Sequence, residues 1–345
     1  MSQSIFCKPV LKINDIEIQY IDSVTFTDSG NNQLQKLSFV ITEPDMENFS
    51  LFNASVEFFL NYGSSDGVPI FRGFVKDYNP TGTKVTVNAL DVRTLISGKN
   101  AFPIVIDDKD NYDGNTITAF LVDVIDNMNH DLLKSTTLND IDKPIYMTNV
   151  RQTGSAYDIA SGLLKKALDK DNMLLPLSYE FDVVHLENHS SLKIIKQKQV
   201  TVTETQTFSY NDGIISCNYK DRVSPSFGIT KAKDGSQVIF QYGNAPRGKV
   251  GISIKGDFGS RGEAKEELIP RVLIEQDTEK DINLNVSKGH YTNLGDVIKI
   301  NVDDDNLNGK YRVTSKRINF TTNSVTCNLQ LNKKPIMVSD YILSQ

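Results

Sequence analysis

The chain has 345 residues, a formal net charge of −6 and a pI near 5.4. With 39% hydrophobic and 23% charged residues, its composition is that of a globular protein of roughly two or three domains. The basic residues are scattered, which argues against sequence-specific binding of nucleic acid. The cysteines Cys7, Cys217 and Cys327 are odd in number and widely spaced, which argues against a disulfide framework and a structural zinc site.

The N-terminal stretch shows neither a signal peptide nor a membrane span. It has no charged segment followed by an apolar one, and nowhere does an apolar run approach 18 residues. We therefore expect a protein that is made in a cytoplasm and does not insert into a membrane.

Residues 10–100 alternate between apolar and polar side chains and are rich in β-branched residues. Turn residues separate the apolar segments at short intervals, at 31–32, 63–67 and 79–82. Such spacing is typical of a small antiparallel barrel or sandwich. The predicted strands lie within 10–28, 35–45, 54–63, 68–80 and 84–91.

Residues 101–200 change character and predict an α+β segment. Apolar residues recur at helical spacing over 115–133, and Ser155 with Asp158 forms a capping box before a second helix over 155–170. Between them, 143–150 has the composition of a strand. Residues 177–198 predict a hairpin whose turn is Glu187-Asn188-His189.

Residues 201–335 return to strands, with a helical insertion near 260–280. Ser260 and Glu263 form a second capping box before the helix, and Pro270 predicts a break within it, because a proline lacks the backbone N–H donor and clashes with the preceding turn. The expected strands are 200–210, 213–222, 228–234, 236–243, 282–302, 309–320 and 324–332. A loosely attached tail, 336–345, would end the chain.

One acidic stretch, Asp303 to Gly309, matches the first half of an EF-hand loop. Counted from Asp304, the match then fails: the twelfth position is Ser315 instead of an acidic residue, and Lys310 and Arg312 bring positive charge to the seventh and ninth positions. Both flanks alternate like strands, so the loop predicts a hairpin in which Asn308 and Gly309 take positive φ angles. The aspartates at 107, 108, 110 and 113 are interpreted in the same way, as a solvated loop.

No catalytic, cofactor-binding or metal-binding residue is predicted. The histidines at 130, 185, 189 and 290 lie on different elements, where surface or helix-end roles fit better than catalysis. Glu266 and Glu267 have the spacing of an exposed helix face, and Cys217 and Cys327 alternate like small core residues. The sequence contains no serine-hydrolase elbow, phosphate-binding loop or dinucleotide fingerprint.

The closing strands, 284–332, resemble those of the central hub proteins of phage baseplates. The family pattern there is a strand, a Gly-Asp turn, a strand, a glycine-containing loop and two further strands. Leu294 stands where the family usually has proline, the family's histidine is replaced at 318–319, and Pro270 interrupts a usually unbroken helix. The matching residues are Leu294, Gly295, Asp296, Ile298, Ile300, Gly309, Tyr311, Val313, Phe320, Val325 and Leu329.

The resemblance extends upstream, since 71–98 is similar to the end of the family's first barrel, 154–168 to its middle helix and 212–235 to its entry into the second barrel. It implies an α+β, mostly β fold: two similar antiparallel β-barrel-like domains with an inserted α+β domain. The expected boundaries are 1–100, 101–200 and 201–335, followed by the tail 336–345. A short echo between 84–90 and 324–330, each closing a β section, agrees with two similar domains.

The resemblance also implies a function. Hub proteins form a homotrimer whose six β domains make a pseudo-sixfold ring, and this ring adapts the threefold central spike to the sixfold tail tube. The implied partners are the spike, the tube or tube-initiator protein, and wedge and tape-measure proteins, with genome DNA passing through the channel. The implied location is the tail baseplate of the virion, with no enzymatic role and no cofactor.

Two alternatives remain open. The first is a tail-tip hub of a non-contractile tail, which a neighbouring sheath gene would argue against. The second is a host-surface protein that binds or processes carbohydrate, which would need exposed aromatic side chains along a groove and a pair of carboxylates. The chain has no Trp but 13 Tyr.

Overall fold

The chain is mostly β and divides into two compact units, each described separately below. In the computed structural model the first unit comprises Met1–Leu163, Tyr179–Ile195 and Arg317–Thr326, and the second comprises Leu164–Ser178, Lys196–Lys316 and Cys327–Gln345. The structure describes residues 8–30, 32–42, 50–61, 67–98, 101, 103–106, 112, 114–138, 141–147, 152–169, 175–176, 179–196, 206–221, 227–241, 251–256, 258–276, 280–287, 292–303, 307–321 and 324–332. The predicted tail 336–345 lies outside these residues, and the boundaries at 100, 200 and 335 stay a prediction.

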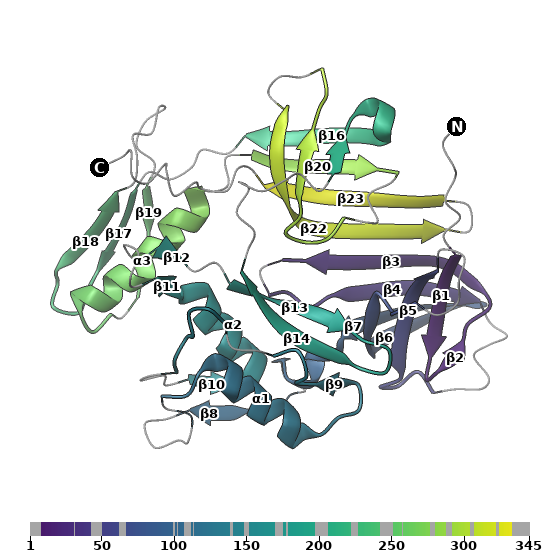
Figure 1. Cartoon of the computed structure of the whole chain (residues 1–345), viewed down its shortest axis with the longest axis horizontal. Coiled ribbons are helices and arrows are strands. Elements are labelled where there is room, and N and C mark those ends of the chain that lie inside the picture. Colours follow the sequence, from purple (N-terminus) through teal and green to yellow (C-terminus); the bar gives the residue numbers. More distant parts are fainter. Residues whose placement is uncertain are drawn as a thin grey trace. The chain divides into compact units, whose positions relative to one another are not determined.

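The first unit is built on an antiparallel sheet that follows the predicted strands of 10–100 (Figure 1). Buried and less buried residues alternate along its central strands, as expected where one face of a sheet covers the core. Its hydrogen-bonded order is β3-β4-β7-β6-β5-β1-β2. The strands are β1 (Lys8–Ile13), β2 (Ile16–Glu17), β3 (Ile21–Ser29), β4 (Lys36–Thr42), β5 (Ser55–Asn61), β6 (Phe71–Thr81) and β7 (Lys84–Asp91).

This sheet curls around its own core. The rings of Phe26 on β3 and Phe71 on β6 lie 6.3 Å apart, although β4 and β7 separate these strands in the sheet. Phe58 on β5 contacts Phe320 at a ring distance of 5.4 Å, both rings in edge-to-face geometry. Phe320 belongs to β22 (Gly309–Thr321), whose last residues, 317–321, are part of the first unit and lie beside β3.

Gly73 allows two strands of this sheet to approach closely. A Cβ atom built on it would lie 2.0 Å from the carbonyl oxygen of Leu90 on β7, far inside contact distance. Only glycine fits where β6 passes the end of β7.

The rest of the first unit carries two helices and short strands. Helix α1 (Ile117–Met128) begins at Thr116, whose hydroxyl accepts from the amide of Ala119, and ends at Asn129 in the left-handed conformation. The predicted hairpin is present as β13 (Tyr179–His185) and β14 (Ser190–Lys196), with its turn at 186–189. The other elements are η2 (Val92–Leu95), β8 (Ile104–Ile106), β9 (Leu133–Lys134), β10 (Gln152–Gly154) and α2 (Ala156–Lys166).

The second unit has a sheet whose strand order matches that of the first unit. Its order is β16-β20-β23-β22-β21-β15, which corresponds strand by strand to β3-β4-β7-β6-β5-β1. Strands β3 and β16 each carry an irregular step, between Ile21 and Ser23 and between Ile214 and Ser216. The pair β15–β21 is parallel where β1–β5 is antiparallel. The strands are β15 (Gln206–Phe208), β16 (Ile214–Asp221), β20 (Lys280–Val286), β21 (Val297–Ile300), β22 and β23 (Ser324–Asn332).

A smaller layer in the second unit is formed by α3 (Arg261–Gln276) and the sheet β18-β17-β19, on which it packs (Figure 1). Ala264, Leu268 and Val272 of the helix face Val238 and Ile254 in one apolar cluster. A Cβ atom on Gly228 would lie 2.6 Å from Leu268, so the helix sits tightly on β17 at this point. The strands are β17 (Phe227–Lys231), β18 (Gln237–Gln241) and β19 (Gly251–Ser253); β11 (Leu168–Asp169), β12 (Leu175–Pro176) and η4 (Tyr210–Asp212) complete the unit.

Three expectations need correction. Helix α3 runs through Pro270 without a break, because the apolar residues on both sides of the proline, Leu268 and Val272, hold it against one sheet. Residues 143–147 form no extended strand, and Tyr146 makes only an isolated bridge to Thr116. The expected strand 282–302 is two strands, β20 and β21, separated by the Gly-Asp turn.

Candidate functional site

The most distinctive side chains of the first unit are two buried arginines. The first, Arg93, forms an ion pair with Asp91, and their side chains are 3% and 0% exposed. Nε of Arg93 donates to both carboxylate oxygens at 3.0 Å, and Nη2 donates to Oδ2 at 2.6 Å. Such a two-armed geometry satisfies both charges, which a buried pair requires.

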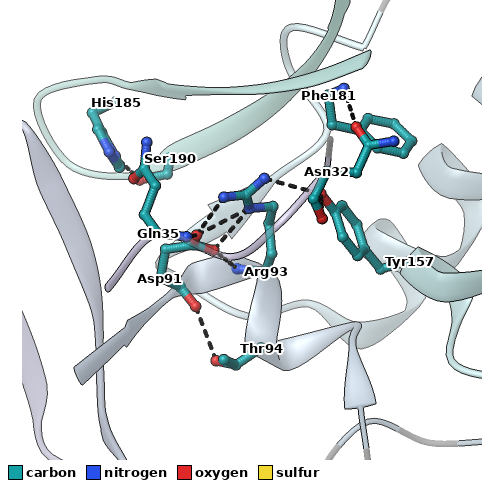
Figure 2. Close-up of polar contacts among 9 residues, drawn as sticks. All are labelled: Asn32, Gln35, Asp91, Arg93, Thr94, Tyr157, Phe181, His185 and Ser190. Carbon is teal, nitrogen blue, oxygen red and sulfur yellow. Dashed lines mark hydrogen bonds and ion pairs between the residues drawn. The ribbon is translucent and has the colours of Figure 1, made fainter. Parts of the chain in front are cut away.

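Local structure explains why Asp91 lies there. It ends β7 and caps η2, because its Oδ1 accepts from the amide of Arg93 at 2.8 Å. Its Oδ2 also accepts from the amide of Gln35, and its backbone carbonyl accepts from the hydroxyl of Thr94 at 3.0 Å. One carboxylate therefore fixes the exit of β7, the start of η2 and the entry to β4 (Figure 2).

Arg93 extends this network to α2 and β13. Its Nη1 donates to the hydroxyl of Tyr157 at 2.9 Å, and that hydroxyl donates to the carbonyl of Asn32 at 3.1 Å. The side-chain oxygen of Asn32 accepts from the amide of Phe181 at 2.8 Å (Figure 2). Asn32 adopts φ of 59°, a conformation that asparagine tolerates better than most residues.

The pKa values of these groups follow from their burial and charges. Burial raises the pKa of the Tyr157 hydroxyl to about 12, which keeps it protonated and able to donate. Burial opposes the charged form of Arg93, yet the facing Asp91 raises the pKa of its guanidinium above the ordinary value. The network is therefore a set of fixed charges and fixed donors.

The second buried arginine, Arg72 on β6, holds the turn of the β13–β14 hairpin. Its Nε donates to Glu57 on β5 at 2.6 Å. Nη1 donates to the carbonyl of Leu186 at 3.0 Å and Nη2 to that of Glu187 at 2.9 Å. A planar guanidinium suits this task, because it presents several donors in a rigid plane.

His185, at the end of β13, lies beside this arginine. Its Nδ1 is 2.8 Å from the hydroxyl of Ser190, and its Nε2 is a buried atom without a hydrogen-bond partner. Burial, reinforced by the neighbouring Arg72 and Arg93, lowers its pKa to about 4, although Asp91 acts in the opposite direction. The expectation of a surface or helix-end role is wrong for this histidine.

These contacts make the two arginines a structural clamp. We use the term arginine clamp for Arg72, Asp91, Arg93 and Tyr157. Asp91, Arg93 and Tyr157 bind each other and the backbone of Gln35 and Asn32. Arg72 binds Glu57 and the carbonyls of the hairpin turn. Because the charges are satisfied internally, these contacts are suited to fixing the β13–β14 hairpin and α2 on the curled sheet.

The acidic loop joins two antiparallel strands, as predicted, since Ile300 of β21 pairs with Gly309 of β22. Asp304 and Asn306 lie outside the described residues. Asn308 is not among the residues with positive φ, so that expectation is wrong: its side chain instead accepts from the amide of Val302 at 2.7 Å and closes the loop. Gly309, at φ of 158°, is close to extended.

The structure distributes the other residues of interest over separate places. His130 accepts from the amide of Leu132 and contacts the Phe74 ring edge-on, and His189 lies in the hairpin turn, 3.2 Å from Thr136. Glu266 is exposed on α3, as predicted. Cys327 is buried, as predicted, and burial raises its pKa to about 12, whereas Cys217 is half-buried. Cys7, His290 and the aspartates at 107, 108, 110 and 113 lie outside the described residues.

Among the residues that the structure describes, no group of three His, Cys, Asp or Glu side chains could hold a metal ion. Nor is any helix in that part of the chain long and apolar enough to cross a membrane. The expectations of no catalytic, cofactor or metal residue stay predictions.

Sequence reasoning missed the arginine clamp. Asp91 was visible as an acidic residue closing a β-branched strand, which is a capping signal before a new element. Nothing local marks Arg72 as buried, because its partners lie 15 to 118 residues away. Arg93 lies two residues from Asp91, but its other partner, Tyr157, is 64 residues away.

No family model matches the sequence, and no curated protein matches it. Solved structures do match. A tail protein from Neisseria meningitidis has a TM-score of 0.68 at 8% identity, covering 97% of this chain and 99% of its own. The 43 kDa tail protein of prophage MuSo2 from Shewanella oneidensis has 0.65 at 13% identity, covering 95% and 97%.

A third match is the c3393 protein of E. coli, described as a type VI secretion component similar in structure to the phage T4 tail proteins gp27 and gp5. Its TM-score is 0.58 at 10% identity, covering 96% of this chain and 78% of its own. The chain therefore has the fold of phage tail proteins over nearly its whole length. The resemblance noted in the closing strands is confirmed at the level of the fold.

Proposed function

We propose that this protein is the central hub of a phage tail baseplate. In this role three copies form a homotrimeric ring that connects a threefold central spike to the sixfold tail tube. The observation that carries the proposal is the repeated strand order, β3-β4-β7-β6-β5-β1 and β16-β20-β23-β22-β21-β15, in a chain with a tail-protein fold.

The repeat would let a trimer match a sixfold tube. A chain with two similar barrel-like domains contributes two positions to a ring, so three chains supply six. Such a ring has true threefold symmetry and approximate sixfold symmetry, and it can bind a trimer on one face and a six-membered tube on the other. The curled sheet, with its Phe26–Phe71 and Phe58–Phe320 contacts, supports a barrel-like form for the first domain.

The arginine clamp fits a mechanical role. A hub transmits force between spike and tube, so its parts must not shift against each other. Charged pairs that are buried and fully hydrogen-bonded are costly to separate, because separation leaves an unpaired charge in the core. The clamp would hold the middle domain firmly to the first barrel-like domain.

The proposed partners are the central spike, the tube or tube-initiator protein, and baseplate wedge and tape-measure proteins. The protein would reside in the virion baseplate, after assembly in the host cytoplasm. It would bind no nucleic acid by sequence, although genome DNA would pass through the ring. We expect a neutral to acidic channel wall, because repeated Lys and Arg contacts to phosphates would retard the DNA.

The direct test is the mass of the protein in solution. Three times the chain mass of 38.6 kDa is expected by light scattering, and class averages of negatively stained particles should show a ring with six lobes. A monomer at all accessible concentrations, with and without the purified spike, would contradict the proposal. A stable dimer would contradict it as well.

The proposal assigns no catalysis to the chain. An assay for cleavage of host-surface glycans separates it from the carbohydrate-processing alternative, and cleavage by the purified trimer would contradict the structural assignment. A sheath gene beside the gene for this chain would place the hub in a contractile tail; a tail locus without one would place it at the tip of a non-contractile tail.

A further inference from the structure

The repeat makes it possible to match single residues between the two sheets. Strands β6 and β22 correspond: both end in threonine, Thr81 and Thr321, and two residues separate each from the next strand. Counting back from these ends, Asn79 matches Asn319. Strands β3 and β16 also correspond, because each pairs with the strand, β4 or β20, that in turn pairs with the last strand of its sheet, β7 or β23.

The register of the sheets matches Thr25 on β3 with Ser216 on β16. Thr25 pairs with Ser38, which pairs with Asn88 on β7. Ser216 pairs with Asn285, which pairs with Asn328 on β23. Asn88 and Asn328 are each the fifth residue of their strands, so the two rows coincide. Each repeat thus has a hydroxyl residue on one outer strand and an asparagine near the end of its long strand.

In the first unit, one hydroxyl and one asparagine meet. The hydroxyl of Thr25 donates to the side-chain oxygen of Asn319 at 3.1 Å, where residues 317–321 of β22 lie beside β3. Ile318 and Phe320 in this stretch are 0% and 2% exposed. The contact between β3 and the end of β22 is therefore tight and apolar, with one polar pair at its side.

Among the residues that the structure describes, the matching pair, Ser216 and Asn79, makes no such contact. Strand β7 occupies one edge of β6, and on the other edge β5 pairs only as far as Phe74. No described strand pairs with residues 76–81 on that edge, and none pairs with β16 on the edge away from β20. Tyr78 on β6 is 48% exposed, although its counterpart Ile318 is buried, and Ile215 on β16 is 55% exposed.

We propose that β16 of one copy pairs with residues 76–81 of β6 in the next copy, repeating between chains the contact that β3 makes with the end of β22. This inference rests on the proposed trimeric hub and assigns its subunit contact. Ser216 of one copy would donate to Asn79 of the next, and Ile215 and Tyr78 would become buried. Open edges with exposed apolar side chains are otherwise prone to aggregation, which a closed ring prevents.

The contact uses two different surfaces of the chain, so it is head-to-tail. Such a contact must either close into a ring or continue as a fibre. In a closed trimer, three contacts within chains alternate with three contacts between chains. All six would have the same strand geometry, which is the condition for approximate sixfold symmetry.

Disulfide trapping tests the contact directly. Residues facing each other on paired strands have Cα atoms about 4.5–5.5 Å apart, within the range that a disulfide spans. In a background with Cys7→Ser and Cys217→Ser, chains carrying Asn79→Cys are mixed with chains carrying Ser216→Cys and oxidised by dissolved oxygen with a copper catalyst. We expect a covalent dimer from the mixture and none from either variant alone. A chain carrying both changes should give a covalent trimer.

A matched control lies in the first unit. Thr25→Cys with Asn319→Cys occupies the equivalent positions within one chain, so it should form an intramolecular disulfide, and the covalent product should have the mass of a single chain. If this control closes and the protein is a trimer by light scattering, but positions 79 and 216 do not cross-link, the inference is overturned and the trimer stands. If the protein is a monomer throughout, the proposed function falls and the inference falls with it.

A second variant tests the apolar part of the contact. Ile215→Glu places a charge where burial is expected, so the trimer should dissociate at a protein concentration at least about tenfold higher than the parent does. Ile239→Glu is the matched control, because Ile239 is also an exposed isoleucine on a strand, in the small layer of α3. Equal effects of the two changes, or none at Ile215, would overturn the inference. Circular dichroism should show that both variants remain folded.

Discussion

The two repeats place opposite chemistry at one matching position. The eighth residue of β7 is Asp91, and the eighth residue of β23 is Leu331; both are buried. Asp91 binds Arg93 and two backbone amides, because the chain turns there into η2 and then carries α2, whose Tyr157 joins the network. Leu331 pairs in register with Ile282 of β20 and continues an apolar core. A shared strand order therefore does not require a shared core. The charged residue stands where the chain leaves the sheet and its irregular backbone needs hydrogen-bond partners.

The largest expected effect comes from breaking the charged side of this comparison. Arg93→Met leaves the Asp91 carboxylate buried without its counter-charge, which should destabilise the first unit by about 4 kcal/mol. Hydrogen exchange should increase in β7, η2 and α2, and less so in α3. The double change Asp91→Leu with Arg93→Met should recover much of the loss, because an apolar pair replaces the ionic one. Failure to recover would show that the backbone contacts of Asp91 matter more than its charge.

The apolar counterpart should cost somewhat less. Leu331→Ala removes buried methyl groups and leaves a cavity, which typically costs about 3 kcal/mol. The exchange of β20 and β23 amides should rise, while β4 and β7 keep their protection. Gln330→Ala, at the exposed neighbouring position, should change exchange little. Equal disturbance of both repeats by Leu331→Ala would mean that they unfold as one, against the comparison.

A pH titration sharpens the comparison, because His185 belongs to the first unit. Its pKa is about 4 in the fold and 6.5 in the unfolded chain. Between these values the unfolded chain binds a proton that the folded chain does not, so stability is lost as the pH falls from 6.5 to 4. Allowing for partial exposure, we expect a loss of about 2 kcal/mol. His185→Gln should remove this part of the pH dependence in denaturant unfolding; an identical profile in variant and parent would contradict the assignment.

The smallest effect compares two helix caps, one in each unit. Ser155 accepts from the amide of Asp158 at the start of α2, and Ser260 accepts from that of Glu263 at the start of α3, both at 3.2 Å. Replacing either serine by alanine should cost about 1 kcal/mol. Each change should raise exchange only in the first turn of its own helix, and a wider effect would show that the helix starts nucleate larger regions.

Local patterns were sufficient for most elements but not for the contacts between them. Alternation predicted β4, β7, β22 and β23, and the two serine caps marked the starts of α2 and α3 within a residue or two. The expected helix break at Pro270 was wrong because the sequence shows only the local energetic penalty of a proline. The packing of α3 on β17 and β18 is a tertiary contribution, which local sequence does not show. The two-residue and three-residue strands β8 to β12 carry too few residues to show any period.

The candidate site could not be read from the sequence for a related reason. Arg72 reaches the turn carbonyls of Leu186 and Glu187 across more than a hundred residues, and no spacing rule reports that. The matched edges of β6 and β16 are also invisible locally. The short echo between β7 and β23, 84–90 with 324–330, became informative only when the strand order fixed which residues correspond.

Gly73 is a position at which we expect the fold to restrict the sequence. At 8% and 13% identity to the Neisseria and Shewanella tail proteins, almost every aligned side chain differs although the fold is shared. Most strand positions accept any residue of suitable polarity, but a Cβ atom at Gly73 would overlap the carbonyl of Leu90. An evolutionary alignment built on the structures, with no reference to sequence, should therefore show glycine retained at this column while the strands on either side vary freely.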